Sequence, residues 1–270
     1  MNKQDLPIGV FDSGLGGLTA LSRLQQDLPN EDFIYFGDTA RVPYGGRDRE
    51  TLRTFAQQVI AFLRGQGVKA ILVACGTLSS TVLEELQATV DFPLIGVVEG
   101  AADAAASATE NRKVAIWATP VSIGAGAYVR RLERRNIKDT VGVPCPKLVP
   151  LIESGHTSRR DEELNSAIDE YLKPILELGA DTLILGCTHY PLIKKAIAAR
   201  AERPLHLIDS GKESVNNLVD ALEKADLLCR KERLGQTRYF VSGDPLEFIR
   251  NGEEFLKIDL AGKVEQRSAE

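Results

Sequence analysis

Short apolar segments alternate along the chain with longer amphipathic ones. The apolar segments are continuous rather than interrupted by polar residues, which is typical of parallel strands that are covered on both faces of a sheet. Because strand-like and helix-like segments alternate, the pattern predicts an α/β fold with mainly parallel sheets. The predicted strands are residues 8–11, 32–36, 69–74, 93–98, 113–118, 181–186, 205–208 and 238–242.

Two amphipathic segments predict long helices. Residues 48–67 carry one apolar face, and Asp48 is a suitable N-cap for that helix. Residues 161–179 have the same periodicity with Pro174 inside it, where we expect a kink or a change of register.

A weak internal repeat accompanies these elements. The segments VACGT and LGCTH each follow an apolar run and precede a helical pattern, and FDSG returns later as IDSG. In open α/β sheets, ligands bind beyond the carboxyl ends of the strands. The repeat therefore places Cys75 and Cys187, one in each copy, where a ligand is expected.

Composition and charge argue against a nucleic-acid-binding, membrane or secreted protein. The formal net charge of -5 argues against a nucleic-acid partner, which usually requires a basic surface. No uncharged stretch reaches the roughly 18 apolar residues of a membrane span, and the first residues have no signal-peptide pattern. We expect a cytoplasmic protein without a membrane partner, in which all four cysteines are thiols.

Cys75 and Cys187 are the strongest candidates for chemistry. Each is expected at the start of a helix, where unpaired backbone N–H groups should lower the pKa of the thiol. Cys145 and Cys229 lack this context and are interpreted as structural thiols.

Several chemistries remain open for these two thiols. Zinc binding is weakly indicated, because only Cys187 and His189 are closely spaced. A redox pair would be closer in sequence, and a Cys187–His189 nucleophile for acyl transfer would leave Cys75 unexplained. Inversion of a stereocentre without a cofactor requires two acid/base groups on opposite faces of one carbon atom. Two matched thiols meet that requirement, and no GxGxxG dinucleotide motif is present.

Motifs along almost the whole chain resemble the aspartate/glutamate racemase superfamily, and glutamate racemases in particular. They are GVFDSGLGGLTAL, YFGDTARVPYGGR, LVACGTLSS, PLIGVVEGA, CPKLVPLIESG and GCTHYPLI, in this order. The resemblance implies two pseudo-symmetric α/β domains with the active site between them. We place the first domain at residues 1–98 plus 208–270 and the second at 99–207.

The resemblance also implies roles for individual residues. Cys75 and Cys187 would be the catalytic acid/bases, Asp12 would assist Cys75, and Glu153 and His189 would assist Cys187. The substrate, glutamate, would be held at Asp12, Ser13, Tyr44, Gly45, Gly76, Thr77, Ser122, Thr188 and His189. Taken alone, each of the hydroxyl residues could equally be an ordinary helix cap. No pyridoxal phosphate, metal or nucleotide cofactor would be needed, and the D-glutamate formed would serve peptidoglycan synthesis, cell wall biogenesis and cell shape.

The sequence departs from the family pattern in three places. A stretch that usually resembles GTxGT reads ATPVS here (residues 118–122), in which Ser122 keeps a hydroxyl. The family has Asn where this chain has Gly76, so we expect a slow racemase that Gly76→Asn would accelerate. Trp117 stands where the family has a small aliphatic residue, and it could act together with Gly76 on substrate choice. The alternatives are a racemase of aspartate or another small acid, and a weakly active homologue that binds a protein. The sequence leaves a homodimer open.

Overall fold

The structure, a computed structural model, describes residues 2–256 and 259–269. Its strands form two sheets, and every strand pair in both sheets is parallel. The first sheet has the order β10-β9-β2-β1-β3-β4, and the second has the order β6-β5-β7-β8. The predicted α/β fold with mainly parallel sheets is therefore confirmed.

The strands of the first sheet are β1 (Ile8–Asp12), β2 (Phe33–Gly37), β3 (Ala70–Val73), β4 (Leu94–Gly96), β9 (Thr237–Val241) and β10 (Val264–Gln266). Those of the second are β5 (Lys113–Ala118), β6 (Asp139–Pro144), β7 (Thr182–Leu185) and β8 (His206–Asp209). The α-helices are α1 (Gly17–Asp27), α2 (Arg49–Gly65), α3 (Gly76–Thr81), α4 (Leu83–Gln87), α5 (Val97–Ala108), α6 (Pro120–Ala125), α7 (Ala127–Glu133), α8 (Leu148–Glu153), α9 (Glu162–Leu178), α10 (Lys194–Arg200), α11 (Ser210–Lys224) and α12 (Pro245–Leu256). Short 3-10 helices are η1 (Lys3–Asp5), η2 (Thr39–Arg41), η3 (Tyr44–Gly46) and η4 (Tyr190–Ile193).

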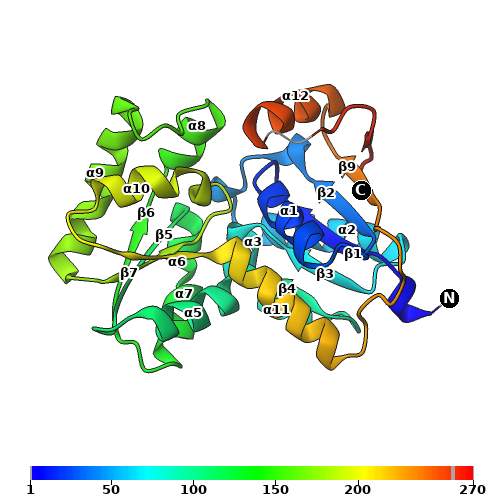
Figure 1. The fold of residues 1–270 in the computed structure, drawn as a ribbon, viewed down its shortest axis with the longest axis horizontal. Coiled ribbons are helices and arrows are strands. Elements are labelled where there is room, and N and C mark those ends of the chain that lie inside the picture. The colour runs from blue at the N-terminus through cyan, green and yellow to red at the C-terminus, as the bar shows by residue number, and fades with distance from the viewer. Residues whose placement is uncertain (1, 257–258, 270) are drawn as a thin grey trace.

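Each sheet is covered by helices on both faces. In the first sheet, side chains of α1, α11 and α12 pack on one face, and those of α2, α3 and α4 pack on the other. In the second sheet, α8, α9 and α10 cover one face, and α5 and α7 cover the other. Figure 1 shows the sheets in two separate lobes, with both ends of the chain in the lobe of the first sheet.

The sequence-based boundary between the domains falls inside β8. Because β8 pairs with β7 of the second sheet, we propose that the second domain extends through Asp209. The chain then returns to the first lobe through α11, which packs against both α1 and α5.

Both predicted long helices are present, as α2 and α9, while a kink or change of register at Pro174 stays a prediction. Asp48 caps α2 by accepting a hydrogen bond from the Thr51 N–H at 2.9 Å. Asp161 caps α9 in the same way at the Leu164 N–H, and α9 continues past Pro174 to Leu178.

The strand predictions were wrong in three places. Residues 97–98 begin α5 instead of extending β4, because a short apolar run does not distinguish a strand from a buried helix. β6 and β10 were missed, because both are edge strands with partly exposed residues and carry no continuous apolar run. None of the described helices has the length and apolar content that a membrane crossing requires.

Candidate active site

The two thiols follow strands of different sheets and lie where the sheets meet. Cys75 comes two residues after β3, and Cys187 comes two residues after β7. Both are buried, with 5% and 8% of their surface exposed. A Cβ atom built on Gly76 would lie 3.8 Å from the Cα atom of Cys187, so the two cysteine-bearing turns are in contact.

Asp12 and Ser13 lie beside Cys75. The Cys75 thiol donates to the Ser13 hydroxyl at 3.6 Å. The Gly14 N–H donates to Oδ2 of Asp12 at 3.0 Å, and the Tyr35 hydroxyl fixes the same loop by donating to the Gly14 carbonyl at 2.7 Å. Oδ1 of Asp12 is buried without a hydrogen-bond partner among the described residues.

The pKa of Cys75 is shifted opposite to our expectation. Burial raises the pKa to about 12, and the charge of Asp12 adds to the increase. Hydrogen bonds from the Leu78 backbone and with Ser13 lower it, but by less. Cys75 does sit at the N-cap of α3, yet desolvation of the thiolate outweighs the favourable helix terminus. Cys75 therefore holds its proton at neutral pH.

His189 and Glu153 lie beside Cys187. Nδ1 of His189 is 3.6 Å from the Cys187 sulfur, and Nε2 is 3.0 Å from Oε1 of Glu153, the last residue of α8. Burial by itself lowers the pKa of His189, but the hydrogen bonds and charges of Cys187 and Glu153 outweigh it and raise the pKa to about 10. The ring is therefore an imidazolium at neutral pH, and its Nδ1 faces the Cys187 sulfur.

A cluster of hydroxyl groups joins the two domains near the thiols. Thr77 Oγ1 lies 3.1 Å from Thr119 Oγ1, and Thr119 Oγ1 lies 2.9 Å from Ser122 Oγ. A Cβ on Gly45 would be 3.4 Å from the Thr119 side chain. We had not predicted Thr119 as a site residue. Its signal in the sequence was a Thr-Pro pair directly after a predicted strand, which is a helix-start pattern.

The hydroxyl group of Tyr44 binds a buried carboxylate instead of facing the thiols. The hydroxyl donates to Oδ2 of Asp38, and the ring packs against Phe55 with centroids 5.6 Å apart. Asp38 is fully buried and also accepts from Arg41 at 2.7 Å and from Ser242 at 2.7 Å. The Tyr44 side chain therefore anchors its own loop, which leaves its backbone as the part that can face a ligand.

Thr188 completes the turn that carries Cys187. It is buried, and its carbonyl oxygen lies 3.5 Å from the Thr19 hydroxyl of α1. The structure thus gathers Asp12, Ser13, Gly76, Thr188, His189 and Glu153 around the thiols, with Gly45, Thr77 and Ser122 linked through Thr119.

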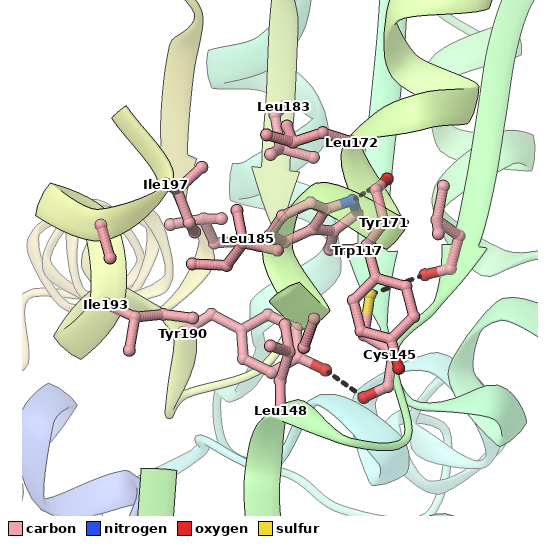
Figure 2. Close-up of a cluster of buried hydrophobic side chains, with 14 of the residues drawn as sticks. Trp117, Cys145, Leu148, Tyr171, Leu172, Leu183, Leu185, Tyr190, Ile193 and Ile197 are labelled. Atoms are coloured by element: carbon pink, nitrogen blue, oxygen red, sulfur yellow. Dashed lines mark hydrogen bonds between the residues drawn. The ribbon is translucent and has the colours of Figure 1, made fainter. Parts of the chain in front are cut away.

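Trp117 lies outside this arrangement. Its side chain is fully buried in the second domain, and its indole N–H donates to the Tyr171 carbonyl of α9 at 3.2 Å (Figure 2). The ring packs edge-on against Tyr171, with centroids 6.1 Å apart. Trp117 therefore fills the core under α9, and an effect of its side chain on substrate choice stays a prediction.

The other two cysteines fit their predicted structural role. Cys145 is buried and its thiol donates to the Val143 carbonyl at 3.3 Å, while Cys229 is half-buried in the connection before β9. Among residues 2–256 and 259–269, no group of three or more His, Cys, Asp or Glu side chains is arranged to hold a metal ion.

A cavity of about 840 Å³ adjoins the Asp12 and Glu153 sides of the candidate site. Gly14 and Leu15 line it from the first domain, Glu153 and Ser154 line it from the second, and α12 contributes Glu247. The thiols themselves are nearly covered and do not line this cavity.

Known proteins share both the sequence and the fold of this chain. Residues 13–218 match the family model of Asp/Glu/Hydantoin racemases. A glutamate racemase from Geobacter metallireducens is 41% identical over 264 residues, which are 97% of this chain and 97% of that protein. The glutamate racemase from Francisella tularensis, solved in complex with D-glutamate, has a TM-score of 0.90 and 36% identity, with 99% of both chains covered. A glutamate racemase isoform from Bacillus anthracis has a TM-score of 0.92 and 30% identity over 98% of both chains. The chain therefore belongs to the Asp/Glu/hydantoin racemase family, as an amino-acid racemase of the glutamate racemase group.

Proposed function

We propose that this protein interconverts L-glutamate and D-glutamate by a two-base reaction of Cys75 and Cys187 that needs no cofactor. The observation that supports it best is the pairing of the two thiols across the domain contact. Each thiol comes from its own sheet and has its own polar partners, Ser13 and Asp12 for one and His189 and Glu153 for the other.

The Cys75 thiol and the His189 imidazolium support one direction of such a reaction. Cys187, beside the imidazolium, would act as the base and remove the α-proton of one enantiomer. The Cys75 thiol would then donate its own proton to the opposite face of the same carbon atom. Cys187 ends as a thiol and Cys75 as a thiolate, which is the arrangement that runs the reverse reaction. One proton leaves the substrate and one is returned, so the step is balanced without an oxidant or reductant.

The surrounding polar groups match the charges of glutamate. The free oxygen of Asp12 would accept from the α-ammonium group. Hydroxyls of Ser13, Thr77, Ser122 and Thr188 would donate to the two carboxylates, together with backbone N–H groups at Tyr44, Gly45 and Gly76. Glutamate is proposed over aspartate because the relatives at about 40% identity are glutamate racemases and one neighbour was solved with D-glutamate.

Single-thiol variants test this proposal. Cys75→Ala and Cys187→Ala should each abolish racemisation in both directions, because every turnover uses both thiols. Each variant should still exchange the α-proton of one enantiomer with solvent deuterium, and the two should prefer opposite enantiomers. Cys229→Ala, away from both turns, is the control and should racemise at the wild-type rate.

Circular dichroism with L-glutamate, L-aspartate and L-alanine in turn identifies the substrate. Near wild-type racemisation by either single-thiol variant would refute the two-base mechanism, and faster turnover of aspartate would refute the substrate. We further propose that the D-glutamate serves peptidoglycan synthesis in the cytoplasm, which stays a prediction, as does a homodimer.

A further inference from the structure

Two glycines of the first domain contact the turn that carries Cys187, here called the Cys187 turn (residues 186–189). A Cβ atom on Gly76 would lie 2.3 Å from the Gly186 carbonyl oxygen. A Cβ on Gly16 would lie 2.2 Å from Thr188 Oγ1 and 2.8 Å from the His189 ring. Real Cβ atoms essentially never approach other heavy atoms closer than 3.0 Å. The Cys187 turn therefore occupies the space that a side chain at either position would need.

The Gly186 side of this contact is firmly held by hydrogen bonds to β5, α7 and the start of α11. The Gly186 N–H donates to the Trp117 carbonyl at 2.8 Å, and the Tyr128 hydroxyl lies 3.4 Å from the Gly186 carbonyl oxygen. The Ser210 hydroxyl holds the preceding residue by donating to the Leu185 carbonyl at 2.6 Å. A clash at Gly76 is therefore with fixed backbone, whereas the nearest atom to Gly16 belongs to a side chain that can rotate.

We propose that Gly76 and Gly16 are positioning residues that set how closely the Cys75 and Cys187 turns approach across the domain contact. This inference rests on the proposed two-thiol function. With any side chain at position 76, the Gly186 carbonyl must retreat by about 0.7 Å to restore a 3.0 Å contact. Because Gly186 is fixed to the second sheet, this retreat moves Cys187 away from Cys75. A misplacement of about 1 Å can cost roughly a hundredfold in rate.

This geometry reverses the expectation that Gly76→Asn accelerates the enzyme. Asparagine brings the same Cβ atom as alanine, so it meets the Gly186 carbonyl before its amide can reach a substrate. The absence of a side chain at Gly76 therefore allows the close contact with the Gly186 carbonyl. We expect Gly76→Asn to lower kcat/KM.

The test compares Gly76→Ala and Gly16→Ala with Gly65→Ala, whose new Cβ would meet nothing within 4 Å. We expect Gly76→Ala to lower kcat for both enantiomers by about tenfold to a hundredfold. Gly16→Ala should also lower it, because its Cβ meets the His189 ring as well as Thr188, and Gly65→Ala should be unchanged. Alkylation of Cys75 and Cys187 by iodoacetamide, resolved by peptide mass spectrometry, should accelerate in both site variants, because the domains are held apart.

Wild-type kcat and wild-type alkylation rates in Gly76→Ala would overturn the inference, as would a higher kcat/KM in Gly76→Asn. If Gly76→Ala does not fold, Gly16→Ala carries the same two measurements. Failure of the proposed function looks different: the wild-type protein would not racemise glutamate, while the alkylation rates would still report whether the glycines control the approach of the turns.

Discussion

Nε2 of His189 lies 3.0 Å from Oε1 of Glu153, and this contact joins the turn after β7 to the end of α8. The other ring nitrogen faces the Cys187 sulfur, so Glu153 acts on Cys187 through the imidazolium. Because this contact raises the pKa of His189, it should affect the pH dependence of both stability and activity.

The first consequence is a pH dependence of stability. The folded-state pKa of about 10 is above the usual value of 6.5, so the imidazolium stabilises the fold. That contribution is fully present below pH 6.5 and is lost as the pH rises through 10. Glu153→Gln removes a partner that raises the pKa, so the variant should lose less stability than the wild type across this interval. Urea unfolding at several pH values measures the difference.

The same variant should shift the alkaline limb of the activity profile to lower pH, because its imidazolium deprotonates sooner. Glu170→Gln is the matched control, since Glu170 is an exposed carboxylate that pairs with Lys147. An alkaline limb that is identical in wild type and Glu153→Gln would show that the Glu153 contact does not act on the reaction.

Asp12 is expected to affect Cys75 in two opposite ways. Its charge raises the pKa of Cys75, so Asp12→Asn should lower that pKa and increase the rate of Cys75 alkylation at pH 9. The same change removes the proposed acceptor for the substrate ammonium, so kcat/KM should fall by about tenfold to a hundredfold. Alkylation followed against pH, together with steady-state kinetics, checks both effects. Slower alkylation in Asp12→Asn would contradict the electrostatic account.

Tyr44→Phe should act on stability more than on substrate binding. The hydroxyl donates to buried Asp38, and losing a hydrogen bond to a charged group costs about 1.5–3 kcal/mol. We expect a lower free energy of unfolding with KM for glutamate little changed. Ser242→Ala removes the other hydroxyl on Asp38 and should destabilise the protein similarly. A large increase in KM with unchanged stability would instead place the Tyr44 hydroxyl on the substrate.

Local pattern in the sequence determined most of the secondary structure and the position of both thiols. The apolar runs that became β1, β3, β5 and β7 are encoded within a few residues each, and so are the caps at Asp48 and Asp161. The fold class followed from their alternation, and Cys75 and Cys187 followed from their places just after strands. The edge strands β6 and β10 were not predicted. A strand that pairs along one side alone does not require a continuous apolar run.

Only the tertiary structure decided what surrounds those thiols. Helix position alone suggested a lowered pKa for Cys75, but burial and the charge of Asp12 raise it to about 12. The sequence shows a tyrosine in a glycine-rich loop, whereas the fold turns its hydroxyl onto Asp38. The sequence shows only that Gly76 has no side chain. In the fold, the Gly186 carbonyl occupies the space that a side chain at position 76 would need. Periodicity is a property of neighbours in the chain, while desolvation and close contact depend on residues that meet only when the two domains pack together.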